Sequence, residues 1–244
     1  MIEEISLLSG NDIPFFPAKI NIHQPTIKEI AYIGEESFFL GCQLLNFSKE
    51  SLAIEDKEGL SDLNDFDILM SILLDESAKS QKICFEMLLS LMFPEYSISI
   101  TLEKISLKKE EEEVELNREN FGEFQNITKR MFSIESSAEE SYKPANAAAA
   151  KIAEKLKKGR EKVAQLKGED LTKIAILSRY ISILSVGLQM DIRIFLDYTV
   201  YQLFDIFKRF QMLQSFDINL KARMAGASDL EEVDNWMEDI HKSN

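Results

Sequence analysis

Histidine, cysteine, glycine and proline are scarce in this chain of 244 residues, which holds two His, two Cys, nine Gly and five Pro. Because Gly and Pro form most obligatory turns, their scarcity favours helices over a strand-rich fold. Neither of the common glycine motifs that cradle phosphates, GxGxxG or GxxxxGK followed by Ser or Thr, occurs in the chain. The sequence therefore gives no indication of a nucleotide-binding loop.

Groups that could perform catalysis are equally few. Only His23 and His241 could serve as an imidazole base, and neither lies beside a Ser or Cys nucleophile motif. Catalysis by a pair of carboxylates remains an alternative in so acidic a chain. However, no pair stands in apolar surroundings that would separate the two pKa values. We therefore predict no catalytic, cofactor-binding or metal-binding residues, and we expect a protein that is not an enzyme.

Signals for export, disulfides and membrane insertion are also missing. Cys42 and Cys84 stand alone in apolar stretches, so we predict two buried free thiols, with a disulfide or a metal site as the alternative. The first ten residues, MIEEISLLSG, are acidic where a signal peptide is basic. The most apolar window, Leu171–Met190, is interrupted by Lys173 and Arg179. We expect a cytoplasmic protein without a membrane span.

Negative charge is concentrated in the first part of the chain. The formal net charge is −14, and residues 1–142 hold 12 basic and 28 acidic side chains, whereas residues 143–244 hold 16 and 14. Nucleic-acid binding needs a basic surface to neutralise phosphates, so this distribution argues against it. A local exception is Lys151–Lys167, with seven basic and two acidic residues. No aromatic residues alternate with these charges, so a solvated face or an acidic protein partner is favoured over nucleic acid.

The pattern of apolar residues predicts a mainly α (α+β) fold in two parts. Residues 1–132 form an acidic α+β subdomain with short strands near 19–23 and 97–116, the second region being a small antiparallel hairpin or meander. Residues 133–146 are polar and lack an apolar period, so they are predicted to be a linker. Residues 147–244 form a C-terminal helical bundle.

Within the first subdomain, several details are specific enough to check. Thr26 and Glu29 have the spacing of a capping box at a helix start. The helix expected over residues 80–92 should turn Ile83 and Met87 inward, together with Leu88 and Leu91. Further helices are expected over residues 35–47, 66–74 and 120–132. The charged run KKEEEE at 108–113 is interpreted as a turn that discourages edge pairing, rather than as a metal site, because consecutive carboxylates point in different directions.

The second subdomain is organised around one long helix, predicted over about 191–225. Its apolar residues recur at spacings of four, three, four and three, which is one face of a helix: Leu196, Val200, Leu203, Phe207 and Phe210. A helix over 171–188 precedes it. A short acidic helix over 229–244 follows, with Gly226 as the hinge or C-cap between the last two helices.

Aromatic residues are the candidate contacts with a partner protein. Phe15 and Phe16 stand between Pro14 and Pro17 in what we expect to be an irregular arm over residues 1–17. The long helix and the tail add Tyr198, Tyr201, Phe204, Phe207 and Trp236. For each of these aromatics the sequence leaves open the alternative that it packs in the core of this chain itself.

Two long stretches of the sequence resemble a known kind of protein. They are INIHQPTIKEIAYIGEESFFLGCQLLNFSK, preceded by IPFFP, and NAAAAKIAEKLKKGREKVAQLKGED, continuing through ILSRYISILSVGLQM and YTVYQLFDIFKRFQ to KARMAGASDLEEVDNWMEDIH. Together they resemble tail assembly chaperones of tailed bacteriophages and prophages. The early part is also similar in style to baseplate-hub assembly proteins, with an IP-type strand followed by a PT-KEI helix start.

This resemblance implies a non-enzymatic assembly factor without a cofactor. Its partner would be the tape-measure protein or another tail or baseplate protein, with self-association as a further option and without nucleic acid or membrane. Its location would be the host cytoplasm, or the virion tail or baseplate if the protein stays in the particle. A baseplate-hub assembly protein or a minor virion structural protein is the alternative that the resemblance allows.

Overall fold

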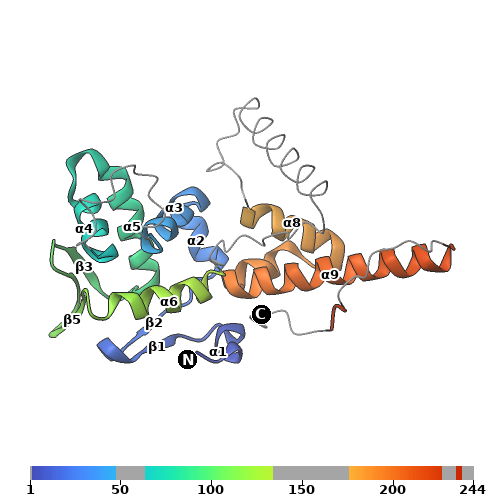
Figure 1. The fold of residues 1–244 in the computed structure, drawn as a ribbon, viewed down its shortest axis with the longest axis horizontal. Coiled ribbons are helices and arrows are strands. Elements are labelled where there is room, and N and C mark those ends of the chain that lie inside the picture. Colours follow the sequence, from blue (N-terminus) through green and yellow to red (C-terminus); the bar gives the residue numbers. More distant parts are fainter. Residues whose placement is uncertain (1, 48–63, 134–175, 227–234, 238–244) are drawn as a thin grey trace, which may run out of the picture.

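The computed structural model describes residues 2–47, 64–133, 176–226 and 235–237, and these form a mainly helical fold with two small antiparallel sheets (Figure 1). The predicted fold class, mainly α with an α+β first part, is confirmed. Helices α2 to α6 and a three-stranded sheet occupy one end of the molecule in Figure 1, and α8 and α9 extend toward the other end. The predicted linker and the basic segment 151–167 lie outside the described residues, as does most of the predicted tail helix.

The first 22 residues are more regular than the sequence indicated. They contain α1 (Glu4–Ser9), β1 (Ile13–Phe15), the 3-10 helix η1 (Phe16–Ala18) and β2 (Ile20–Ile22). β2 confirms the strand predicted near 19–23, and it pairs with β1 in antiparallel register. The prediction of an irregular arm over 1–17 was wrong, because Leu7, Ile13 and Phe15 are buried in the core and hold the segment in place.

The helices of the first part follow the predicted boundaries closely. They are α2 (Ile27–Ile33), α3 (Glu35–Leu45), α4 (Asp65–Leu74), the 3-10 helix η4 (Glu76–Ala78), α5 (Lys79–Met92) and α6 (Phe121–Met131). The capping box at the start of α2 is confirmed: the Glu29 backbone N–H donates to Thr26 Oγ1 over 3.3 Å, and the Thr26 backbone N–H donates to the Glu29 carboxylate over 2.7 Å.

The prediction of which face of α5 points inward was partly wrong. Ile83 and Met87 are exposed, whereas Phe85 and Leu89 are buried. The reason is the close approach of α5 to α3 at Gly41, where an added Cβ would lie 2.9 Å from both the Cys84 carbonyl oxygen and the Leu88 Cβ. α5 carries apolar residues on several sides, so only this contact decides which of them face the core.

The predicted meander is confirmed as a three-stranded antiparallel sheet of β3 (Ser97–Ile100), β4 (Ile105–Lys109) and β5 (Glu112–Leu116). Its charged residues belong partly to the strands, since Lys108 lies opposite Glu113 and Lys109 opposite Glu112. The turn itself is shorter than predicted. Cross-strand pairs of opposite charge stabilise such a ladder, so the acidic run contributes to the register of the sheet.

The C-terminal part consists of α8 (Ile176–Leu188), the 3-10 helix η6 (Ile192–Asp197) and α9 (Val200–Met224). The prediction of one helix over about 191–225 was wrong at its start, because Tyr198 is extended and Thr199 is the N-cap of α9. The Ile27 backbone N–H donates to the Tyr198 carbonyl oxygen over 2.8 Å, which fixes this break. Gly226 follows α9 with φ of 96°, as expected for a residue that ends a helix.

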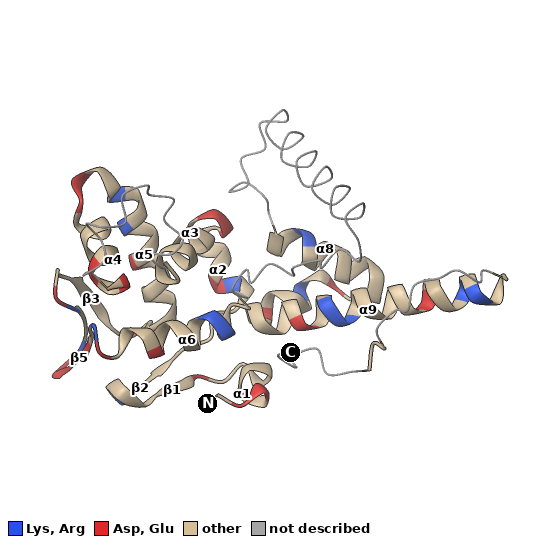
Figure 2. Ribbon diagram, viewed as in Figure 1, with Lys and Arg blue, Asp and Glu red and all other residues tan. Residues whose placement is uncertain are grey.

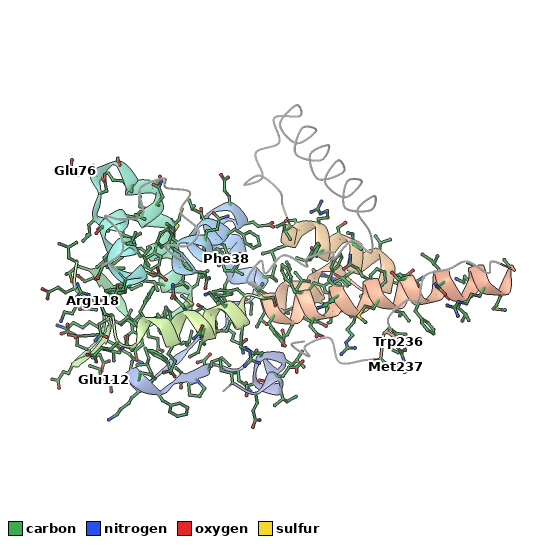
Figure 3. The ribbon with its side chains drawn as sticks, viewed as in Figure 1. Phe38, Glu76, Glu112, Arg118, Trp236 and Met237 are labelled. Carbon is green, nitrogen blue, oxygen red and sulfur yellow. The ribbon has the colours of Figure 1, made fainter. Side chains whose placement is uncertain are left out.

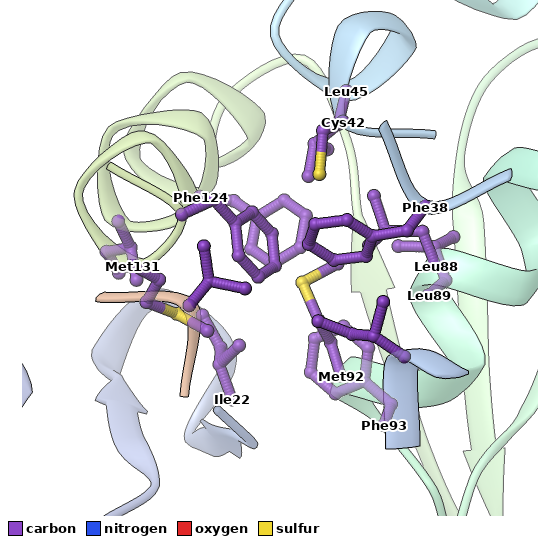
Figure 4. Close-up of a cluster of buried hydrophobic side chains, with 14 of the residues drawn as sticks. Ile22, Phe38, Cys42, Leu45, Leu88, Leu89, Met92, Phe93, Phe124 and Met131 are labelled. Atoms are coloured by element: carbon purple, nitrogen blue, oxygen red, sulfur yellow. The ribbon is translucent and has the colours of Figure 1, made fainter. Parts of the chain in front are cut away.

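One hydrophobic core joins the two parts of the described chain. Figure 4 shows a section of it, where Ile22, Phe38, Leu88 and Phe124 meet. The same cluster includes Leu203 and other residues of α8, η6 and α9. The division into two subdomains stays a prediction, and in the described residues both predicted parts contribute to this core.

The two thiols are free, as predicted, but only Cys42 is fully buried. Burial raises the pKa of the Cys42 thiol well above its ordinary value, so this thiol stays protonated and acts as a small apolar side chain. Cys84 is half-buried on α5, a consequence of the helix rotation described above.

Candidate functional site

The N-terminus of α9 contacts the N-terminus of α2, and both helices begin with a capping box. Thr199 and Gln202 form a capping box like that of Thr26 and Glu29, and the two Thr residues face each other in an isolated antiparallel bridge. The Gln202 side-chain amide also donates to the Leu8 carbonyl oxygen over 2.7 Å. The repeated pattern, Thr-apolar-x-Glu/Gln, was visible in the sequence at both places, but only the fold brings the two copies together.

α8 is positioned by a side chain from outside its own part of the chain. The Glu35 carboxylate accepts hydrogen bonds from the Leu177 backbone N–H over 2.5 Å and from the Ser178 hydroxyl over 3.1 Å. Such a carboxylate at a helix N-terminus stabilises the helix electrostatically. α8 then packs along α9, with the Tyr180 and Phe207 rings stacked at a centroid distance of 3.6 Å.

The cover that α8 gives to α9 ends near Phe210. Gly187, in the last turn of α8, lies so close to this ring that an added Cβ would come within 2.3 Å of it. The 25 residues of α9 correspond to a helix of about 37 Å, and its C-terminal half continues beyond α8 (Figure 1).

The C-terminal half of α9 carries apolar side chains that are open to solvent. Leu213, Phe216, Leu220 and Met224 follow at spacings of three, four and four, which places them on one face of the helix, and all four are exposed, Met224 by 81%. We call these four residues the distal face. Ile218 is also exposed, on another side of the helix.

A second group of exposed apolar residues lies where α8 leads into η6. We call it the α8–η6 patch, and its members are Ile183, Val186, Leu188, Ile192 and Ile194. Val186 is 78% exposed. Single exposed apolar residues are normal on protein surfaces, but five of them within twelve residues are typical of a site that binds another molecule.

The aromatic residues predicted from the sequence do not form one partner surface. Phe15, Tyr201 and Phe207 are buried, and Tyr198 and Phe204 are partly buried against the core. For the buried three, the alternative left open by the sequence, packing inside the chain itself, describes the structure. Phe16, in contrast, is 78% exposed.

Trp236 lies beside α9 in Figure 3 and is half-buried. The Arg209 guanidinium donates from Nη1 to the Trp236 backbone carbonyl oxygen over 2.9 Å. This contact brings the segment around Trp236 to the middle of α9, whereas its neighbour Met237 is exposed.

A cleft separates the N-terminal arm from α6. It has a volume of about 570 Å³, within the range of ligand-binding pockets, and we call it the arm–α6 cleft. One wall is a single face of α6, with Glu123, Asn126, Ile127 and Arg130 at helical spacing. The other wall is formed by Ile2, Glu3, Ser6, Ile13, Pro14 and Phe16. Arg130 Nη1 donates to the Ile2 carbonyl oxygen over 2.6 Å and so joins the two walls.

A histidine between two carboxylates lies where the arm meets α2. His23 Nδ1 is 2.9 Å from Asp12 Oδ1, and its Nε2 is 3.3 Å from the Glu29 carboxylate. Partial burial lowers the pKa of His23, but the hydrogen bonds to Asp12 and Glu29 outweigh it, so the pKa is raised. Burial raises the pKa of Glu29, and the hydrogen bonds from Thr26 outweigh it, so this pKa is lowered.

Two other kinds of site are absent from the described residues. In these ranges, no three side chains of His, Cys, Asp or Glu are arranged to hold a metal ion. None of the helices described has the length and apolar composition needed to cross a membrane.

Comparison with known proteins relates the C-terminal part to phages. Residues 167–241 match the family model of the YomV second domain, a family derived from Bacillus prophages. The matched range covers less than half of the chain and includes α8, η6 and α9 with both exposed apolar groups. No curated protein and no solved structure matches the chain. The C-terminal part of the chain is therefore similar to a phage-associated domain.

Proposed function

We propose that this chain is a non-enzymatic phage tail assembly chaperone that binds apolar helical segments of the tape-measure protein. The observation that carries the proposal is the α8–η6 patch, a group of exposed apolar side chains in the region that matches a phage-derived family. A tape-measure protein is long, helical and apolar until the tail tube encloses it. A protein that covers such helices in the meantime needs an exposed apolar surface on a stable support.

The support for the α8–η6 patch is rigid. α8 is capped by Glu35 and stacked on α9 through Tyr180, and the Tyr198 carbonyl oxygen just after η6 accepts a hydrogen bond from Ile27. Amphipathic helices bind apolar surfaces through residues at positions i, i+3, i+4 and i+7, which suits a helical partner. A net charge of −14 favours solubility when many copies gather on one partner.

The charge of the chain favours a protein partner over nucleic acid. The acidic first part disfavours nucleic acid, and the proposed location is the host cytoplasm during assembly. A baseplate-hub assembly protein or a minor virion structural protein is the second candidate. The projecting half of α9 favours this candidate, because an exposed helix of this kind suits a permanent contact between subunits.

The test is co-expression of this chain with the long helical protein encoded beside it, followed by affinity pull-down and sizing. We expect a soluble complex with several copies of this chain per partner, and an insoluble partner when this chain is omitted. Val186→Asp should weaken binding at least about tenfold, because a carboxylate in an apolar contact is poorly compensated. The matched control is Ile83→Asp, at an exposed apolar position on α5, far from the patch.

Two outcomes decide between the candidates. Binding that is lost with Val186→Asp and kept with Ile83→Asp supports the chaperone. Failure to bind, combined with detection of this chain in purified virions by mass spectrometry, would instead support the structural role.

A further inference from the structure

The distal face of α9 lies at one end of the molecule, whereas α1, β1 and α6, which line the arm–α6 cleft, lie between its middle and its other end (Figure 1). The two surfaces differ in shape. The distal face is a convex row of apolar side chains on a projecting helix. The cleft is a concave surface with an apolar floor that includes Ile13, Pro14 and Ile127. One face of α6 lines the cleft over two turns, which is the form of a groove that accepts another helix.

The two surfaces differ in their balance of charge: Asp217, Lys221 and Arg223 flank the distal face, and Glu3, Glu123 and Arg130 line the cleft. Lys221 and Arg223 are exposed in the last turn of α9, where Figure 2 shows basic residues in blue. Lys221 forms an ion pair with Asp217. On the cleft side, Glu3 and Glu123 are exposed, and neither carboxylate has a hydrogen bond or an ion pair within the described part of the chain. An apolar segment that carries basic residues would therefore complement this cleft.

The order of the charges also selects one direction of packing. On α6, Glu123 precedes Arg130 by seven residues, about 10 Å along the helix. On α9, Asp217 precedes Arg223 by six residues, about 9 Å. If the two helices pack antiparallel, Arg223 lies near Glu123, while Asp217 keeps its ion pair with Lys221 and Arg130 keeps its hydrogen bond to the Ile2 carbonyl oxygen. The Arg223–Glu123 pair is then the new ion pair between the two copies.

We propose that the distal face of α9 in one copy of this chain docks in the arm–α6 cleft of a second copy. The four residues of the distal face fill the cleft over Ile127 and Pro14, and Phe16 at the rim covers them from one side. Every copy then offers a helix on one surface and a cleft on another. Such a heterologous contact continues from copy to copy, until a ring closes or as an open filament.

This assembly does not depend on the proposed function, because it concerns the chain alone. It leaves the α8–η6 patch of every copy for a partner protein. If self-association fails while the tape-measure protein is still bound through Val186, only the present inference is wrong.

The first experiment measures the mass of the full-length chain, without a partner, by analytical ultracentrifugation at several protein and salt concentrations. We expect assemblies that grow with protein concentration and weaken in high salt, because exposed charge pairs are screened. Glu123→Arg and Arg223→Glu should each weaken self-association at least about tenfold, because each places like charges together. The double variant should recover most of the affinity, while Lys79→Glu, an exposed residue of α5, should have no effect.

The second experiment tests whether the contact joins two different surfaces. Leu220→Asp damages the helix but leaves the cleft, and Glu123→Arg damages the cleft but leaves the helix. Each variant alone should be monomeric, and an equal mixture should form a dimer of one copy of each and nothing larger. Both positions are exposed, and circular dichroism checks that the variants fold.

Several results would overturn the proposal. The wild-type chain could be monomeric at every concentration, or the mixed variants could stay monomeric. Wild-type assembly that resists Glu123→Arg would indicate that two distal faces pair with each other. Leu220→Asp could also abolish partner binding without changing self-association, and the distal face would then belong to the partner.

Discussion

The two halves of α9 have similar apolar residues in opposite surroundings. In the first half, Val200, Leu203 and Phe207 are buried against α8 and the N-terminal part. In the second half, Leu213, Leu220 and Met224 are exposed. The difference arises because α8 ends at Leu188 and covers α9 no further than Phe210. The first half of α9 therefore belongs to the fold, and the second half is available for binding.

The largest expected effect compares two leucines of the same helix. Leu203 is 0% exposed and Leu220 is 46% exposed. Leu203→Ala should lower the free energy of unfolding by about 2–5 kcal/mol, because it leaves a cavity in the core. Leu220→Ala should change it by less than about 1 kcal/mol. Urea unfolding followed by circular dichroism measures both, and equal losses would show that the distal half is also part of the folded core.

A second comparison tests where α8 stops covering α9. Gly187→Ala should destabilise the protein by about 1–3 kcal/mol, because its methyl group would overlap the Phe210 ring. Gly122→Ala is the matched control, since an added Cβ in this α6 position meets nothing within 4 Å. The control should instead raise stability by about 0.5–1 kcal/mol, as Ala favours helices over Gly. Thermal unfolding distinguishes the two signs, and a neutral Gly187→Ala would contradict the close packing.

The start of α9 gives a third prediction. Thr199→Ala removes the N-cap hydrogen bond to the Gln202 backbone N–H and should cost about 1 kcal/mol, whereas Thr199→Ser should restore most of the stability. Hydrogen exchange should show faster opening in the first turn of α9 in the Ala variant. Unchanged exchange in that turn would mean that the bridge to Thr26 alone sets the start of the helix.

The smallest predicted effect is a dependence of the folding stability on pH, which arises from His23 and Glu29 at the start of α2. Because the folded pKa of His23 is raised above its ordinary value of 6.5, its contribution to stability is present below about pH 6.5 and is lost as pH rises through the folded pKa. The lowered pKa of Glu29 acts in the opposite sense, so its contribution is lost as pH falls below its ordinary value of 4.5.

The measurement is urea unfolding of the wild-type chain and of His23→Gln between pH 5 and pH 8. The difference in stability between them should shrink as pH rises, and exchange of the exposed half of α9 should not respond to His23. A difference that stays constant over this range would mean that the histidine contributes only as a neutral side chain.

The sequence predicted helix caps and strand pairing correctly where these depend on residues close together in the chain. The capping box of Thr26 and Glu29 and the ladder of residues 97–116 depend on contacts within a few residues or across a short turn. The inward face of α5 was not predictable, because apolar residues surround that helix and the contact at Gly41 selects among them. The break at Tyr198 was also missed, because an apolar spacing of four residues continues across it from Leu196 to Val200.

For the candidate site, the sequence left open whether the aromatic residues of the long helix belong to the core or to a partner surface, and the structure places Tyr201 and Phe207 in the core. Phe207 and Tyr201 have aromatic side chains of the kind that is common at interfaces, but both are buried in this fold, and Phe207 stacks on Tyr180 of α8. The arm–α6 cleft joins residues more than a hundred positions apart, and no pattern within either segment predicts it.

The sequence by itself determined the mainly helical class, the helix starts of the first part of the chain, the meander and the uneven charge, because these follow from residue type and short-range spacing. The tertiary structure alone decided which apolar residues are buried, where α9 begins and which half of it α8 covers. The physical reason is that the hydrophobic effect has no direction, so burial against any apolar neighbour stabilises an apolar side chain. Only the arrangement of the helices decides which side chains have such a neighbour.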